Sequence, residues 1–86
     1  MPKLPSAHPG QVLREEFLVP LDLPAHAIAI AIDVPRERIE RLAQEEIDLD
    51  TDTALGLARF FGTTPAFWMN LQTQFDLERA ADDTHA

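Results

Sequence analysis

The residues best suited to chemistry are five polar side chains spaced along one predicted helix: Arg36, Glu37, Glu40, Arg41 and Gln44. On a helix in the DNA major groove, Arg and Gln side chains bond base edges or phosphates, and Glu can accept from a cytosine amino group. The same spacing also predicts two i,i+4 ion pairs on a solvated face, Arg36–Glu40 and Glu37–Arg41. The pattern alone leaves both interpretations open.

The charge around these five side chains opposes DNA binding. From Arg36 to Asp52 the sequence has three arginines against seven acidic residues, a net charge of −4. The whole chain has fifteen acidic residues against seven Lys and Arg, and a net charge of −8. Phosphates repel such a surface. Net acidity favours a basic partner, or it serves only to keep the protein soluble.

No pattern of residues points to catalysis or to a metal site. The sequence has no nucleophile–base signature, Gly-rich phosphate loop or zinc-ligand spacing, and His8, His26 and His85 are too scattered to pair as ligands. The absence of cysteine excludes disulfides and thiolate sites and fits a reducing compartment. No apolar run approaches the ~18 residues of a membrane span. We therefore expect a cytoplasmic protein that is not an enzyme, holds no cofactor or metal, and has no membrane partner.

Five helices, in a single all-α domain spanning residues 1–86, are expected to position these side chains. Apolar residues recur at helical spacing, and strand-like alternation is absent. The predicted helices are Pro9–Val19, Pro24–Ile32, Pro35–Glu45, Thr51–Phe61 and Pro65–Ala80. The predicted inward residues of the first four are Val12, Leu13, Phe17, Ile28, Ala29, Ile32, Ile39, Leu42, Ala54, Leu57, Ala58 and Phe61. Residues 1–8 are expected to form a loose arm and residues 81–86 a frayed tail.

Capping residues mark several of these helix ends. A Ser, Thr or Asp side chain before a helix accepts from a backbone N–H that the helix leaves free, and Gly suits the left-handed residue that ends one. The candidates are Asp50 or Thr51 for the start of the fourth helix, Gly62 for its end, Thr64 for the start of the fifth helix, and His8 as an N-cap-like partner of the first.

The second and third helices have the spacing of a helix-turn-helix unit. Such a unit needs a small residue where its helices touch, and apolar residues in its turn and second helix. Ala29, Val34, Ile39 and Leu42 supply these features. A plain three-helix packing pattern produces the same spacing, so the spacing alone does not decide between them.

Several motifs occur in register between residues 8 and 79. They are His8-Pro9-Gly10, the run 13–18 (Leu-Arg-Glu-Glu-Phe-Leu), Pro20-Leu21, Val34-Pro35-Arg36, Arg38-Ile39, and the stretch 53–79 with Phe67, Trp68, Leu71 and Phe75. With these motifs the chain resembles the HigA-type (VapI-like) antitoxins, which are small XRE-related helix-turn-helix proteins. The resemblance implies a five-helix, lambda-repressor-like fold in which the third helix is the recognition helix.

Three positions depart from the pattern of that family. Asp33 occupies the turn position that is usually Gly, although Asp tolerates left-handed backbone better than most residues. Pro24 replaces the usual Ser or Thr cap of the second helix, so the capping hydrogen bond is lost. The loop after the third helix usually carries Asn, Gly and basic residues. Here residues 44–50 read Gln-Glu-Glu-Ile-Asp-Leu-Asp, which puts DNA binding in doubt.

The resemblance also implies partners and a function. A HigA-type antitoxin neutralises a RelE-like toxin that cleaves messenger RNA, and it represses its own operon by binding operator DNA. A basic cognate toxin suits the acidic chain, whereas operator DNA does not. We expect a homodimer, with Phe67, Trp68, Leu71 and Phe75 divided between the core and the interface. The alternatives are a stand-alone helix-turn-helix repressor, a member that has lost DNA binding and acts as a protein-interaction module, and an accessory subunit of an enzyme.

Overall fold

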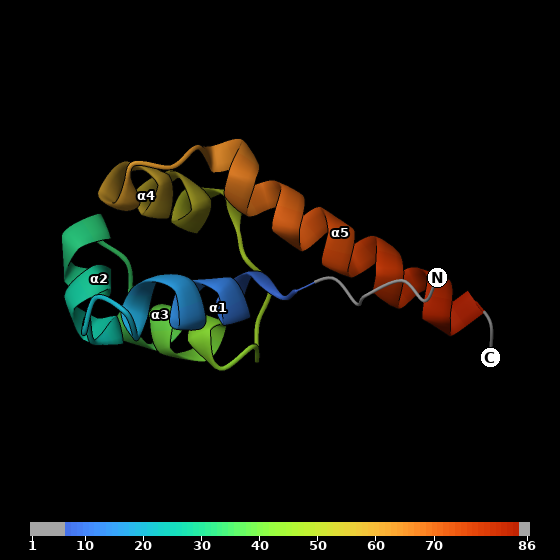
Figure 1. Ribbon diagram of the computed structural model, residues 1–86, viewed down its shortest axis with the longest axis horizontal. Coiled ribbons are helices and arrows are strands. Elements are labelled where there is room, and N and C mark those ends of the chain that lie inside the picture. The colour runs from blue at the N-terminus through green and yellow to red at the C-terminus, as the bar shows by residue number, and fades with distance from the viewer. Residues whose placement is uncertain (1–6, 85–86) are drawn as a thin grey trace.

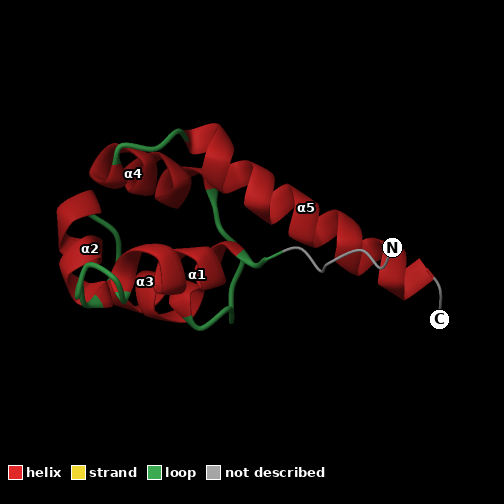
Figure 2. Ribbon diagram, in the orientation of Figure 1, coloured by secondary structure: helices red, strands yellow, loops and turns green. Residues whose placement is uncertain are grey.

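The computed structural model describes residues 7–84, and every regular element among them is helical (Figure 1). The elements are α1 (Pro9–Val12), η1 (Leu13–Leu18), α2 (Ala25–Ile32), α3 (Arg36–Ala43), α4 (Thr51–Phe61) and α5 (Pro65–Thr84). Loops and turns join successive helices (Figure 2). The predicted all-α, five-helix fold is confirmed, with α1 and η1 together forming the first helix.

Two predicted helix ends differ from the structure. The third helix ends at Ala43 instead of Glu45, because Glu45 adopts a φ of 63° and turns the chain out of the helix. The fifth helix continues to Thr84, so residues 81–84 are helical and do not belong to a frayed tail. The outer parts of the predicted arm and tail, residues 1–6 and 85–86, lie outside the described residues.

The helices form a body from which the long helix α5 extends. Helix α2 packs against α3 and α4, α1 packs against α3, and α5 packs against α4 and α1. The far half of α5 continues away from α2 and α4, so most of its surface has no neighbouring helix (Figure 1). None of the helices between residues 7 and 84 combines the length and the apolar character that crossing a membrane requires.

One apolar core joins these elements. Its largest fully buried apolar side chains are Leu13, Ile28, Ile39, Leu42, Leu57 and Trp68. Ala29, Ala54 and Ala58 are buried with them. Burying one large apolar side chain contributes about 1.5–3 kcal/mol, so this cluster is the main source of stability. Most of the predicted inward residues are confirmed, whereas Val12, Phe17, Ile32 and Phe61 pack against the core and stay partly exposed.

The first helix changes its winding after α1. Residues Leu13–Leu18 form a π-helix, in which backbone N–H groups donate to carbonyls five residues back. Because the wider turn places residues five apart on one face, Leu13 and Leu18 are both buried. The sequence predicted ordinary helical spacing with Phe17 inward. Phe17 instead lies at the edge of the core, with its ring centre 4.5 Å from that of Phe61.

Three helix starts are capped by side chains that the sequence predicted as caps. The bonds join His8 Nδ1 to the Gly10 N–H (2.9 Å), Asp50 Oδ1 to the Thr53 N–H (2.8 Å), and Thr64 Oγ1 to the Phe67 N–H (3.1 Å). Each cap satisfies a backbone donor that the helix leaves free, which is worth about 1 kcal/mol for the common capping residues. His8 is only 4% exposed, so the predicted loose arm does not include it.

Three helix ends use a residue in the left-handed conformation. Asp33 follows α2 with φ 59° and Gly62 follows α4 with φ 71°, as the sequence predicted. Glu45 takes the same role after α3, where the next N–H, that of Glu46, returns to the Arg41 carbonyl at 2.9 Å. Gly adopts this conformation without a Cβ clash, whereas the two acidic residues are strained by it.

The apolar residues singled out in the fifth helix have different environments. Trp68 is fully buried, and Leu71 packs against the core. Phe75 is half-buried, with its ring centre 4.8 Å from that of His8. Phe67 is 41% exposed. Trp68 therefore belongs to the core and Phe67 remains available to an interface, while the dimer itself stays a prediction.

Candidate nucleic-acid interface

Helices α2 and α3 meet through a three-residue turn, residues 33–35. Asp33 reverses the chain, and the Val34 N–H returns to the Ala29 carbonyl at 3.0 Å. Ala29 is 2% exposed, as a contact between the two helices requires. Pro24 precedes α2 and provides no side-chain cap. The predicted helix-turn-helix unit is therefore present together with the strained turn and the missing cap.

The outer face of α3 carries four of the five predicted DNA-binding residues, and the fifth, Gln44, is the C-cap that follows the helix. Arg36, Glu37, Arg41 and Gln44 are exposed, and Glu40 is half-buried. A shallow groove of about 270 Å³ is lined by Glu37, Glu40, Arg41, Gln44 and Glu46. Four of the five predicted residues therefore share one groove. Arg36 does not line the groove. Glu46 does line it, although the sequence analysis did not predict it as a site residue.

One of the two predicted i,i+4 ion pairs forms within residues 7–84. Arg36 Nε lies 2.6 Å from Glu40 Oε1, and 68% of the Arg36 side chain is exposed. Glu37 and Arg41 make no ion pair in this part of the chain. An exposed pair is worth about 0–1 kcal/mol, so a phosphate can replace Glu40 beside Arg36 at small cost. Arg41 can bind a phosphate or base without breaking any such pair.

Most carboxylates of the acidic loop 44–50 are held by groups outside the groove. Glu45 pairs with Arg14, Asp48 accepts from Gln72, and Asp50 pairs with Arg38. Glu46 is the one loop carboxylate in the lining of the groove. The negative charge on the groove is therefore smaller than the count of −4 indicates. Three carboxylates nevertheless line the groove together with Arg41, which has no ion pair among residues 7–84.

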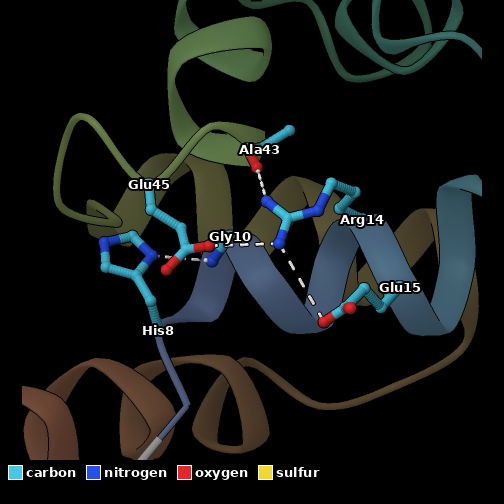
Figure 3. Close-up of polar contacts among 6 residues, drawn as sticks. All are labelled: His8, Gly10, Arg14, Glu15, Ala43 and Glu45. Atoms are coloured by element: carbon cyan, nitrogen blue, oxygen red, sulfur yellow. Dashed lines mark hydrogen bonds and ion pairs between the residues drawn. The ribbon is translucent and has the colours of Figure 1, made fainter.

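Arg14 of η1 holds the end of α3 (Figure 3). Its guanidinium donates to the Ala43 carbonyl and lies 3.1 Å from Glu45 Oε2 and 3.9 Å from Glu15 Oε2. A cation at a helix C-terminus satisfies a free carbonyl and complements the helix dipole. Arg14 therefore fixes α3 to the first helix at the point where the acidic loop leaves it.

The glycine at position 10 lets α1 approach α3 closely. A Cβ on Gly10 would lie 1.7 Å from the Leu42 carbonyl oxygen, so any larger residue would push the two helices apart. The Gly10 N–H meanwhile donates to His8 at the helix start (Figure 3). The first helix therefore supports α3 by direct backbone contact as well as through Arg14.

Asp50 joins the end of the loop to α3 and α4. Its carboxylate lies 3.4 Å from Arg38 Nη1 and accepts from the Thr53 N–H. Burial opposes its ionisation, but the hydrogen bond from the Thr53 N–H and the Arg38 guanidinium outweigh burial and lower the pKa of Asp50 below its ordinary value. Arg38 therefore serves to hold the loop, and Arg36 and Arg41 are the arginines that α3 offers to a ligand.

Sequence reasoning missed three residues that shape this site. Glu46 enters the groove because the chain turns back at Glu45, and nothing in the sequence marks a Glu for left-handed backbone. Arg14 and Gln72 reach the loop from 31 and 23 residues away along the chain, beyond any local spacing rule. One signal was available: Gln72 follows Trp68 by one helical turn and so had to share its buried face.

The exposed face of α3, its buried contact with α2 and the support from the first helix define a helix-turn-helix protein of the lambda-repressor type. Known proteins agree with this class. The chain is 44% identical over 81 residues to virulence-associated protein I of Dichelobacter nodosus, covering 94% of this chain and 75% of that protein. A scan against protein-family models gave no match.

Solved structures are similar over nearly the whole chain. The Pseudomonas aeruginosa antitoxin HigA with the higBA promoter has a TM-score of 0.89 and 35% identity, covering 93% of this chain and 87% of that one. The antitoxin GraA in complex with its operator has a TM-score of 0.84 and 39% identity, covering 93% of this chain and 81% of that one. The chain therefore belongs to the HigA/VapI-like family of XRE-type helix-turn-helix proteins.

Proposed function

We propose that this protein is the antitoxin of a type II toxin–antitoxin module, which represses its own operon through α3 and neutralises a RelE-like, mRNA-cleaving toxin. The observation that carries DNA binding is the exposed α3 face, where Arg41 shares a groove with Gln44 and has no ion-pair partner within residues 7–84. Two solved relatives of the same fold hold promoter or operator DNA.

The α3 face supplies the groups that a major-groove helix needs. Arg41 and Gln44 bond phosphates or base edges, and Arg36 joins them once a phosphate replaces Glu40. Glu37 and Glu40 accept from cytosine amino groups where the operator presents them. A homodimer presents two such faces to two half-sites, and the doubled contacts offset the repulsion of the acidic surface.

The DNA-binding proposal is tested by retardation of the DNA upstream of the protein's own gene at low salt. Arg41→Gln should weaken binding about tenfold and flatten the dependence on salt, because a single cationic contact is lost. Glu46→Gln should strengthen binding roughly threefold, because a carboxylate leaves the groove. Fluorescence anisotropy at several salt concentrations measures both changes.

Arg59→Gln is the matched control, because Arg59 is an exposed arginine on α4 that does not line the groove. It should leave the affinity unchanged. Failure of the unsubstituted protein to retard its own upstream DNA at low salt, with and without its toxin, would sink the repressor part of the proposal. That result would favour a protein-interaction module that has lost DNA binding, which the three carboxylates of the groove also favour.

The toxin proposal is supported by charge, because a ribonuclease must be basic enough to hold RNA and the chain has a net charge of −8. Co-expression with the product of the adjacent gene should give a complex that purifies intact and weakens as salt is raised. Cleavage of messenger RNA by that product should stop when the protein is added. A neighbour that is not basic, or that neither binds nor cleaves, would leave the stand-alone repressor as the better reading.

A further inference from the structure

Gln72 on α5 is a buried polar side chain whose amide oxygen and nitrogen are both hydrogen-bonded. It is 4% exposed. Its Oε1 accepts from the Leu49 N–H at 2.8 Å, and its Nε2 donates to Asp48 Oδ1 at 3.2 Å and to Asp76 Oδ1 at 2.8 Å. An ionised carboxylate only accepts, so the amide nitrogen must face the two aspartates and the oxygen must face Leu49.

These bonds join α5 to the middle of the acidic loop. The loop is held at its start by Arg14, which pairs with Glu45, and at its end by Arg38, which pairs with Asp50. Between these points the polar contacts to Asp48 and Leu49 come from Gln72. The path of the central loop therefore depends on one side chain that lies 23 residues further along the chain.

The loop in turn places a charge at the DNA face. Glu46 lies in the same loop, between the Arg14 and Gln72 contacts, and it lines the groove with Arg41 and Gln44. A shift of the loop changes the distance from its carboxylate to a bound phosphate, and the repulsion between like charges varies inversely with that distance.

We propose that Gln72 is a positioning residue for DNA recognition: it ties the loop to α5 and so keeps the Glu46 carboxylate in one place beside the recognition helix. The inference rests on the proposed DNA binding. It assigns to α5 a part in DNA binding that does not require any α5 side chain to touch the nucleic acid.

A double-mutant cycle tests this role. Gln72→Met keeps the length of the side chain and removes its hydrogen bonds, so the loop shifts, the distance from the Glu46 carboxylate to the phosphates changes, and operator affinity at low salt should change about threefold. In the Glu46→Gln background the same substitution should change affinity less than about 1.5-fold, because the carboxylate that moves is gone. A residue that only supported the fold would change affinity equally in both backgrounds. Equal changes would therefore overturn the inference.

Two controls complete the experiment. Gln74→Met, an exposed position on the same helix, should leave affinity unchanged. The exchange rate of the Leu49 amide hydrogen should rise in Gln72→Met, since its acceptor is removed. If Gln72→Met fails to fold at the assay temperature, Gln72→Asn replaces it, because the shorter amide keeps its polarity but does not reach the loop.

The outcomes separate the two proposals. No binding of DNA by the unsubstituted protein refutes the proposed DNA-binding function, and the inference falls with it. Binding by the unsubstituted protein, together with unchanged binding by a folded Gln72→Met variant, refutes only the inference. A change in affinity that disappears in the Glu46→Gln background supports both.

Discussion

The three arginines of α3 differ in their ion pairs, and this difference decides what each arginine can bind. Arg36 holds Glu40 in an exposed pair, Arg38 holds Asp50 at the end of the loop, and Arg41 makes no ion pair among residues 7–84. The sequence predicted the Arg36–Glu40 pair because i,i+4 spacing requires only a helix. It did not predict the pairing of Arg38 with Asp50, because the loop that follows α3 must first bring Asp50 back to the helix.

Asp50 gives the folded protein a dependence on pH. Burial opposes ionisation of Asp50, but the hydrogen bond from the Thr53 N–H and the Arg38 guanidinium lower the pKa of Asp50 in the folded state. Its contribution to stability is therefore complete above the ordinary aspartate pKa of about 3.9 and is lost as pH falls through the lower, folded value. Asp50→Asn keeps a capping side chain but removes this charge.

Urea unfolding at pH 6 and at pH 3 measures the effect. Other acidic residues titrate in both proteins, so the informative quantity is the difference in unfolding free energy between the unsubstituted protein and Asp50→Asn. That difference should be larger at pH 6 than at pH 3. A difference that does not change with pH would show that the cap, and not its charge, supplies the stability.

At the scale of the helices, the helix ends show which structural features can be predicted from the local sequence. Gly62 and Asp33 were identified as left-handed ends, because Gly and Asp have recognised preferences for that backbone. Glu45 was not, because Glu has no such preference, and the third helix was therefore predicted two residues too long. The π-helical turn of η1 also escaped prediction, since the burial of Leu13 and Leu18 together depends on the packing of the whole core.

The strained end of α2 predicts a stabilising substitution. Asp33 has φ 59°, a conformation in which a Cβ is unfavourable. Asp33→Gly should raise the free energy of unfolding by up to about 1 kcal/mol. Gly62→Ala, at φ 71°, should lower it by about 1 kcal/mol. Glu45→Gly should gain less than Asp33→Gly, because it also removes the partner of Arg14.

Thermal and urea unfolding of the three variants checks this order. Asp33→Gly and Glu45→Gly both remove a side chain from left-handed backbone, but only Glu45→Gly also loses an ion pair. Gly62→Ala makes the opposite change, because it adds a Cβ to such a position. Destabilisation by Asp33→Gly would mean that the Asp side chain contributes more to the turn than its backbone strain costs.

For the whole molecule, the resemblance and the apolar spacing were sufficient to predict the fold. Trp68, Ile39 and Leu57 were all placed correctly in a helix, and the last two were assigned to the core. The contacts that join distant parts of the chain were not predictable, because Arg14 and Gln72 act on a loop that spacing rules do not connect with them. The candidate site was therefore only partly predicted: its face was, and the groups that position it were not.

The projecting helix α5 bears on the predicted homodimer. Phe67 on this helix is 41% exposed, and Phe60 on α4 is 42% exposed, which gives two similar aromatic side chains on different helices. If α5 forms the interface, Phe67→Glu should shift the protein toward monomer, because a charge would be buried against the partner. Phe60→Glu should leave the dimer intact.

Sedimentation velocity across a range of protein concentrations measures this shift. Circular dichroism confirms that each variant is folded. A protein that sediments as a monomer at all concentrations would contradict the dimer. A dimer that survives Phe67→Glu and dissociates with Phe60→Glu would place the interface on α4.

Trp68 is the only tryptophan of the chain. Its indole N–H donates to Thr63 Oγ1 at 2.7 Å, and its ring lies between those of Phe17 and Phe67. All tryptophan emission therefore originates at the seam where η1 meets α5, one helical turn from Gln72. The wavelength and intensity of this emission therefore report on the packing of α5 against η1. They can be followed while DNA, a toxin or a second subunit binds.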